Sequence, residues 1–498
     1  MLGRARREAV APRSLPAPGR RRRALRRRAR VPTGRAGARD VLPQRPLTLP
    51  RVQAGERRPG AVDETSSRSG SRSAPRRVLV GLTEIAGYAC NLRAGLRALG
   101  VEADVLDLQP GTFGFGDDVP PTRLMRALQR ASRARLARRP GSAGRRLRAA
   151  AQVLLTLPVL AQALRRYDAF VFLYDTAFLR QRELPLLRLL GKRVVYVFCG
   201  SDDRPTYLDG GRSAAGDDPV AACVASVRRK KRLLRRVERY ATAVVTNPAH
   251  GLLHERPFAC FPAIGIPREA GDEPPPTRRS GRPRILHAPT HPAAKGTARV
   301  RAALERLRAR GYAFDYEELQ GVSNGELRER LRRCDLVVDQ VFGDTPMGGL
   351  VADAAVAGKP AVVAGYAWDE LRRFLPAEAF PPSELCAPDG LEDAIARLLE
   401  DERRRLELGR RARAFVAERW SATAVAGRIL DLLDGRERPE WMCDPAELRY
   451  VLGWGQPAER SLALVRAIVE RAGTAALGLA DKPRAEALLL ELAGARAS

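Results

Sequence analysis

The feature that most constrains this chain is a unit of strand, glycine loop, helix and strand over residues 336–364. The apolar run LVV at 336–338 is typical of a buried strand, and a loop that contains glycine and proline follows it. Small residues at 350–357 then favour a helix, which the sequence GKP at 358–360 stops before an apolar run at 361–364. This order is the repeating unit of a parallel sheet covered by helices.

The same alternation fills two parts of the chain, which indicates two domains. It first occurs from residue 78, where an apolar strand, a loop with Gly87, a helix and a second strand follow one another, and it restarts at residue 284 after a proline-rich stretch. We therefore predict an α/β protein with two Rossmann-like, doubly wound domains. The expected segments are a leader at 1–76, a first domain at 77–261, a linker at 262–283, a second domain at 284–434 and a helical appendix at 435–498.

The leader carries more than half of the formal net charge of +31, because residues 1–77 hold 22 arginines against five acids. It has no apolar periodicity, so we expect it to be disordered. Basic arms can bind nucleic acid or anionic lipid. No aromatic residues are interleaved with the charges, so we do not expect a nucleic-acid partner. We therefore favour a solvated tail, or an extension upstream of the native start, over a binding arm.

The cysteines and the apolar runs indicate a cytoplasmic protein. Seven cysteines are scattered singly, which fits neither a disulfide framework nor a zinc site. The longest apolar run, 149–164, contains Pro158 and is too short to cross a bilayer. Residues 122–165 are mostly helical and rich in arginine. This region either lies on an anionic membrane surface, which would make the protein peripheral at the inner face, or exposes a solvated helix face.

The loop and helix after residue 338 predict an anion site. Gly348 and Gly349 leave backbone N–H groups bare at a helix N-terminus, where the helix dipole favours a phosphate. Asp353 lies one turn further on and could meet a ribose hydroxyl. A purely steric use of glycine in the tight turn is the alternative.

Five stretches of the sequence resemble glycosyltransferases of the GT-B fold, the nucleotide-sugar-dependent enzymes of the family-four and family-one kind. The stretches are FCGSDDRP (198–205), HAPTHPAAKGT (287–297), LRRCDLVVDQ (331–340), GGLVADAAVAGKPAVV (348–363) and ARAFVAERWSATAVAGRIL (412–430). The resemblance covers residues 77–434. It implies two facing Rossmann-like domains with the site in the cleft between them, and a role in assembling polysaccharides or cell-surface glycans.

The resemblance also implies roles for individual residues. Lys295 would supply a cation to the departing pyrophosphate, together with the N–H groups of Gly348 and Gly349. Asp202, Glu84 and Asp344 are the candidate catalytic residues. The residues expected around the nucleotide sugar are Lys295, His291, Val322, Thr345, Gly348, Gly349, Asp353 and Gly87. We expect no metal and no cofactor beyond the nucleoside-diphosphate sugar as co-substrate, and a glycan, a lipid-linked glycan or a small molecule as acceptor.

Three positions depart from the pattern of these enzymes. Thr345 stands where the first of two paired carboxylates is expected, with Asp344 one residue earlier, and Cys199 stands where the first-domain loop usually has histidine. His291 replaces a basic residue that usually precedes the Lys-Gly pair. Two alternatives to a transferase stay open: a nucleotide-sugar epimerase or hydrolase on the same fold, and a catalytically degenerate binding protein.

Overall fold

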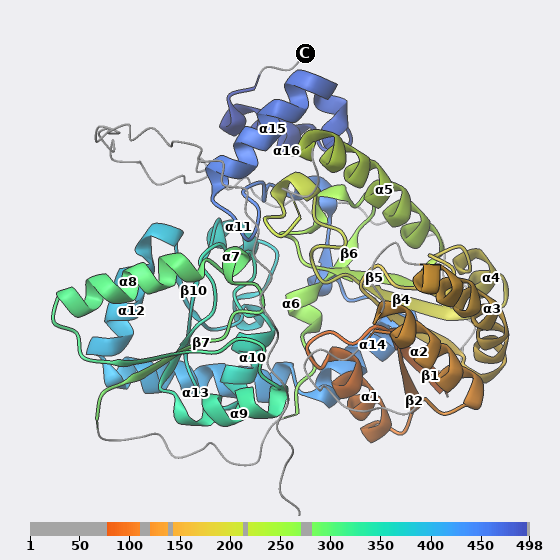
Figure 1. Cartoon of the computed structure of the whole chain (residues 1–498), viewed down its shortest axis with the longest axis horizontal. Coiled ribbons are helices and arrows are strands. Elements are labelled where there is room, and N and C mark those ends of the chain that lie inside the picture. Colours follow the sequence, from red (N-terminus) through yellow and green to blue (C-terminus); the bar gives the residue numbers. More distant parts are fainter. Residues whose placement is uncertain (1–76, 110–119, 138–142, 213–217, 270–280, 496–498) are drawn as a thin grey trace, which may run out of the picture. The chain divides into compact units, whose positions relative to one another are not determined.

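A computed structural model of the chain describes residues 77–109, 120–137, 143–212, 218–269 and 281–495 (Figure 1). The predicted leader at 1–76 lies outside these residues. The described part contains one seven-stranded and one five-stranded sheet. Strands alternate with helices in both, which confirms the predicted α/β class with two doubly wound sheets.

The first sheet has the strand order β12-β6-β5-β4-β3-β1-β2. Neighbouring strands are parallel except β12, which pairs antiparallel with β6. The strands are Arg77–Leu82 (β1), Glu102–Asp107 (β2), Ala169–Leu173 (β3), Arg193–Val197 (β4), Ala243–Thr246 (β5), Phe258–Cys260 (β6) and Met442–Cys443 (β12).

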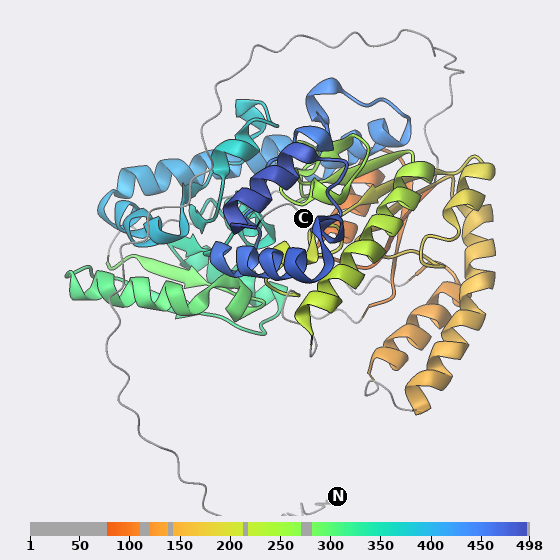
Figure 2. The same ribbon diagram turned by 90° about the horizontal axis from the view of Figure 1, so that it is seen from above.

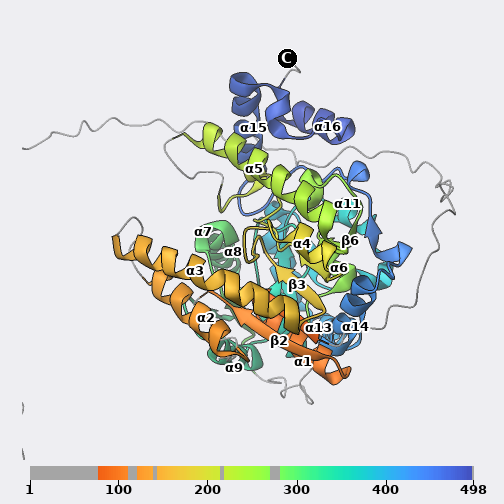
Figure 3. The same cartoon turned by 90° about the vertical axis from the view of Figure 1, so that its right-hand side faces the viewer.

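Helices cover both faces of the first sheet because successive strand residues point to opposite sides. Leu79 packs in one apolar core with α2 and α3, whereas Val78 and Val80 pack in another with α1 and α14 (Ala422–Leu433). Figure 3 shows α3 crossing in front of strands of this sheet. The helices of this part are Tyr88–Ala98 (α1), Arg123–Leu136 (α2), Ala143–Arg166 (α3), Leu184–Leu189 (α4) and Pro219–Tyr240 (α5).

The second sheet is entirely parallel, in the order β11-β10-β9-β7-β8. Its strands are Arg284–His287 (β7), Asp315–Glu318 (β8), Leu336–Val338 (β9), Ala361–Ala364 (β10) and Glu384–Cys386 (β11). Its helices are Pro292–Lys295 (α7), Thr297–Ala309 (α8), Asn324–Arg333 (α9), Gly349–Val356 (α10), Trp368–Arg372 (α11), Leu391–Glu400 (α12) and Glu402–Arg419 (α13).

The chain returns to the first sheet after it has completed the second. Helix α14 (Ala422–Leu433) packs against α1 so closely that a Cβ added to Gly95 would lie 2.0 Å from the carbonyl oxygen of Ala422. The predicted helical appendix contributes β12 to the first sheet and then forms α15 (Ala458–Ala472) and α16 (Pro483–Ala493).

The first residues of the predicted linker at 262–283 belong to the packed structure. Residues Phe261–Ile264 form the short helix α6, and the indole Nε1 of Trp420 donates a hydrogen bond of 3.1 Å to the carbonyl oxygen of Pro262. The backbone N–H of Arg268 donates to the carbonyl oxygen of Trp420 at 2.8 Å. Residues 270–280 lie outside the described ranges. Among the helices that the structure describes, none has the length and apolar character needed to span a membrane.

Candidate functional site

Loops that follow strands of the two sheets meet in a buried cluster of charged residues around Arg204. The Nη2 of Arg204, in the loop after β4, donates to Asp344 in the loop after β9, and its Nη1 lies 3.8 Å from Asp209. The guanidinium also lies over the ring of Trp454, 5.2 Å from its centroid. The side chains of Arg204 and Asp344 are only 4% and 2% exposed. Residues more than a hundred positions apart therefore share one ion pair.

Asp202, a predicted catalytic residue, holds the loop after β4 in place. Its carboxylate accepts hydrogen bonds from the backbone N–H groups of Cys199 at 3.0 Å and Gly200 at 2.7 Å. Burial, together with the neighbouring charge of Asp203, raises the pKa of Asp202 well above its ordinary value. In the structure, Asp202 therefore stabilises the conformation of the loop that carries Arg204.

A second group of charges extends from this loop into α5. His254 is buried between two carboxylates, with Nδ1 2.9 Å from Glu238 and Nε2 3.4 Å from Asp203. Burial opposes the charged imidazolium, but the hydrogen bonds to Asp203 and Glu238 outweigh it and raise the pKa of His254 to about 9. His250 lies alongside, with Nε2 3.2 Å from Asp344.

The environment of Asp344 keeps this predicted catalytic carboxylate ionised. Burial works against the charge, but the charges of Arg204 and His250 outweigh it and lower the pKa of Asp344. Both partners lie in the part of the chain that forms the first sheet. The Asp344 carboxylate thus connects the loop after β9 of the second sheet to residues of the first sheet.

Lys295, the predicted phosphate-binding cation, belongs to an adjoining polar network. It ends the short helix α7, and its Nζ lies 3.0 Å from both Asp339 Oδ1 and Gln340 Oε1. The indole Nε1 of Trp454 donates to the same Gln340 oxygen at 3.2 Å. Trp454 therefore contacts the groups around both Arg204 and Lys295.

The predicted helix N-terminus lies beside Lys295. Gly348 is the N-cap of α10, and no side chain caps this helix. A Cβ added to Gly348 would lie 3.9 Å from Asp339 Oδ2 and 3.9 Å from the methyl group of Thr345. The structure thus brings Lys295, Thr345 and Gly348 together around Asp339, at the carboxyl end of β9.

Asp353, predicted to hold a ribose, forms a buried ion pair that the sequence did not suggest. The Nε of Arg268 lies 2.8 Å from Asp353 Oδ1, and Nη2 donates to the carbonyl oxygen of Gly349 at 3.2 Å. Burial raises the pKa of Asp353, although Arg268 and Arg328 act in the opposite direction. Arg268 was not foreseen because it lies in the predicted linker and belongs to no motif.

The glycine loop of the first sheet approaches the start of α10. The Cβ of Ala86 lies 3.2 Å from the position that a Cβ on Gly349 would take. Gly87 is the N-cap of α1 with a φ of 82°, and Glu84 Oε2 accepts the backbone N–H of Cys90 at 3.0 Å. Burial raises the pKa of Glu84, and its Oε1 is buried without a hydrogen-bond partner among the described residues.

The side chains of two further predicted residues, His291 and Val322, take no part in these charged networks. His291 is exposed and caps α7, where its Nδ1 accepts the backbone N–H of Ala294 at 3.3 Å. Val322 is half-buried in the loop between β8 and α9. In contrast, Arg204, His250 and Trp454 occupy central positions and were not predicted. Arg204 lay within a quoted motif, but a single arginine in a loop gives no indication of its partner.

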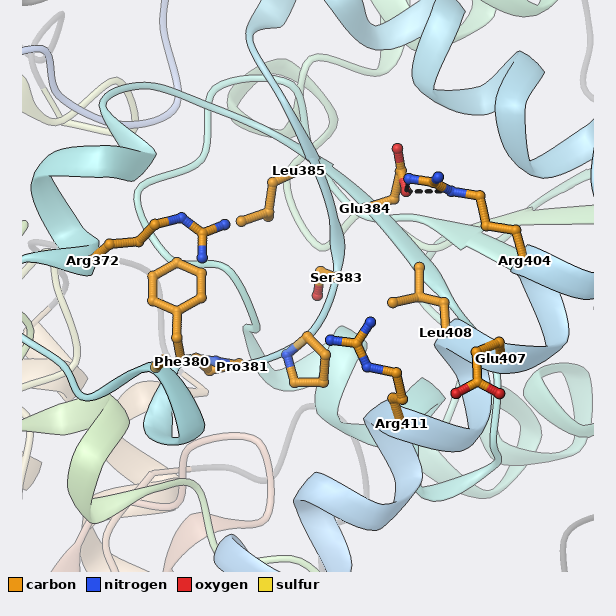
Figure 4. Close-up of a pocket in the computed structure, with 12 residues that line it drawn as sticks. Arg372, Phe380, Pro381, Ser383, Glu384, Leu385, Arg404, Glu407, Leu408 and Arg411 are labelled. Atoms are coloured by element: carbon orange, nitrogen blue, oxygen red, sulfur yellow. Dashed lines mark hydrogen bonds and ion pairs between the residues drawn. The ribbon is translucent and has the colours of Figure 1, made fainter.

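A pocket of about 330 Å³ adjoins the loop that carries Thr345 and Gly348 (Figure 4). Ser383 lies in its wall and donates a hydrogen bond of 2.8 Å to the carbonyl oxygen of Pro346. Arg372 stacks on Phe380 at 4.0 Å from the ring centroid.

Within the described ranges, no group of three or more His, Cys, Asp or Glu side chains is arranged to hold a metal ion.

The comparisons with known proteins found similarity in the fold of the backbone and none in the sequence. No protein-family model matches the chain, and no curated protein sequence matches it. Solved structures that match include Anabaena HepE in complex with UDP, with 13% identity over 72% of this chain and 99% of that chain, and a TM-score of 0.41. Sucrose-phosphate synthase from Thermosynechococcus elongatus has 15% identity over 72% of this chain and 98% of that chain, and a TM-score of 0.45. The catalytic domain of Arabidopsis thaliana starch synthase IV, bound to ADP and acarbose, has 12% identity over 73% of this chain and 100% of that chain, and a TM-score of 0.43.

Proposed function

We propose that this chain is a GT-B glycosyltransferase that transfers a sugar from a nucleoside-diphosphate sugar to a glycan, lipid or small-molecule acceptor without a metal. The observation that carries the proposal is the meeting of Lys295 with the N-terminus of α10 around Asp339. A departing pyrophosphate needs a fixed cation and backbone N–H donors. Both lie at the carboxyl end of a parallel strand, where doubly wound sheets bind ligands.

Lys295 retains a donor for a phosphate. An ammonium group has three N–H donors, and two of them point at Asp339 and Gln340. The third is available to a phosphate oxygen. Asp339 Oδ2 is buried and has no hydrogen-bond partner within the described residues. We assign it to a hydroxyl group of the bound nucleotide sugar.

The remaining contacts to the nucleotide sugar follow the predictions from the sequence. Asp353 Oδ1 is occupied by Arg268, so we assign its Oδ2 to the ribose. We assign Val322 to a contact with the base of the nucleotide and His291 to a contact with a phosphate at the edge of the site. None of these roles requires Asp344, which is held by Arg204 and His250.

Glu84 is our choice for the proton transfer on the acceptor side. Asp202 is bound to loop amides and Asp344 to Arg204, so both carboxylates already have partners. Glu84 Oε1 has no hydrogen-bond partner in the part of the chain that the structure describes, and burial raises the pKa of Glu84, which suits a group that takes up a proton. Its loop reaches Gly349 of α10 through Ala86.

The test is product analysis by mass spectrometry with a panel of nucleoside-diphosphate sugars and mixed glycan and lipid acceptors, with and without EDTA. We expect transfer that EDTA leaves unchanged, and a fall of about a hundredfold or more in kcat for Glu84→Gln. Unchanged kcat in Glu84→Gln would remove Glu84 from the mechanism. Release of free sugar, or its epimerisation without transfer, would replace the transferase by the epimerase or hydrolase alternative.

One observation favours a second candidate, a catalytically degenerate protein that binds a nucleotide sugar. Two of the three predicted catalytic carboxylates, Asp202 and Asp344, are buried and already bound to protein groups. Binding of a nucleotide sugar without any turnover in the same assay would support this candidate. A part in polysaccharide assembly, and a location in the cytoplasm at the inner face of the membrane, also remain proposals.

A further inference from the structure

Helix α3 exposes an apolar face that the protein core does not use. Val153, Leu154 and Leu157 are 62%, 76% and 57% exposed, and they lie within two turns of the helix. The opposite side of α3 carries the residues that pack on the first sheet, among them Val159 and Leu160. The helix is therefore held in place by one face, while the other presents aliphatic side chains to solvent.

The exposed face continues toward the end of the helix without a charge. No charged residue occurs between Arg148 and Arg165, and Pro158 and Ala161 are also exposed. Positions 154, 158, 161 and 165 lie three or four residues apart and so share one side of the helix. The stripe thus ends at Arg165.

Arg165 borders a pocket of about 590 Å³ at the end of this stripe. Arg77 and Arg166, which also line the pocket, pair with Glu102 at 2.8 Å and Asp104 at 3.4 Å. Arg165 is exposed and has no ion-pair partner among the residues that the structure describes. A ligand that combines an apolar chain with a phosphate would match both the stripe and the pocket.

The surroundings of the stripe are strongly cationic. Helices α2 and α3 carry five arginines each and no acidic residue. Figure 2 shows the two helices, coloured orange, side by side, and Figure 3 shows the same pairing. An aliphatic stripe flanked by these arginine-rich helices is complementary to the interface of a bilayer with anionic headgroups.

We propose that the exposed face of α3 docks on an anionic phospholipid bilayer, with its aliphatic side chains in the interfacial layer and a lipid phosphate in the pocket at Arg165. The surface is separate from the network around Lys295, so the proposal stands independently of sugar transfer. It would hold the first sheet against the membrane.

The test is co-sedimentation of the full chain with vesicles of phosphatidylcholine alone, or mixed with phosphatidylglycerol, at low and high salt. We expect binding to the mixed vesicles, weakened by salt. The double variant Leu154→Glu/Leu157→Glu should bind at least tenfold more weakly, because two apolar contacts are lost. Arg165→Gln should bind roughly fivefold more weakly to the anionic vesicles. Leu406→Glu, an exposed leucine on α13, is the matched control and should bind as the unmodified chain does.

The arginine-rich leader could itself bind anionic vesicles. The insertion of α3 into the bilayer must therefore be measured directly. Tryptophan placed by Val153→Trp should be quenched by brominated phospholipids beyond the quenching of the native tryptophans. Vesicle binding without this added quenching, or binding unchanged in Leu154→Glu/Leu157→Glu, would overturn the proposal. Absence of vesicle binding altogether would overturn it too and point to a protein partner. Thermal melting of each variant checks that the fold is intact.

Discussion

At the scale of single residues, the Arg204–Asp344 ion pair is the contact that joins the loops of the two sheets. Both side chains are buried, so removal of the arginine leaves the buried carboxylates of Asp344 and Asp209 without their guanidinium partner. We expect Arg204→Met to lower the free energy of unfolding by about 3–5 kcal/mol. Chemical denaturation measures this. The exposed pair of Arg310 and Glu392 gives the control, and Arg310→Met should leave stability close to unchanged. Equal effects of the two variants would contradict the central role of Arg204.

His254 predicts a pH dependence of stability. Its pKa is raised from 6.5 to about 9 in the folded chain, so its stabilising effect is complete below pH 6.5 and is lost as the pH rises through 9. Lys230, whose pKa is lowered to about 8, acts with the opposite sign, so the comparison must be with a variant. The stability difference between the unmodified chain and His254→Gln should shrink from pH 6.5 to 9. Parallel stability curves would show that His254 is not charged.

The residue scale also shows what the sequence could indicate about the site. Lys295 and Gly348 were foreseen because a lysine before glycine and a glycine at a helix start are local signals. Asp202 and Asp344 were foreseen as carboxylates in loops, but their engagement with loop amides and Arg204 depends on atoms distant in the chain. Partners such as Arg268 and Trp454 have no local pattern, so only the three-dimensional structure identifies them.

At the scale of elements, the contact of α1 with α14 depends on a glycine. A Cβ on Gly95 would lie 2.0 Å from a carbonyl oxygen of α14, so Gly95→Ala should destabilise the fold by about 1–3 kcal/mol although alanine favours helices. Gly427, within α14, has open space around it. Gly427→Ala should therefore be neutral or stabilise by up to about 1 kcal/mol. Chemical denaturation of both variants is the check, and stabilisation by Gly95→Ala would refute the close packing.

Elements with several turns of apolar periodicity or an uninterrupted apolar run followed from the sequence, and three short strands did not. Helices such as α5 and α14 have several turns of apolar periodicity, and buried strands such as β5 have uninterrupted apolar runs. Strands β6, β11 and β12 have only two or three residues, too few to show a period. Helix α1 begins at Tyr88, where Gly87 is the N-cap and the Glu84 carboxylate accepts the backbone N–H of Cys90.

At the scale of the whole molecule, the last part of the chain joins the loops of both sheets. The N–H of Gly455 donates to Phe342 and the N–H of Gly210 donates to the carbonyl oxygen of Trp454, at 2.9 and 2.8 Å. The alternation in the sequence predicts two sheets, since each unit carries its own pattern. The alternation does not predict that the segment around Trp454 joins the two sheets. In the sequence, Trp454 looks like any tryptophan that packs in a core, and nothing near it indicates its partners.

The most direct test of the proposed donor site is thermal stabilisation by nucleoside diphosphates and their sugars. A ligand at a hundredfold excess over its dissociation constant should add about 2.7 kcal/mol of stability. Lys295→Ala should abolish most of this gain, whereas Lys231→Ala, which removes the ion pairs to Glu255 and Asp481, should keep it. Stabilisation by no diphosphate nucleotide, or an equal gain in Lys295→Ala, would contradict a donor site between Lys295 and α10.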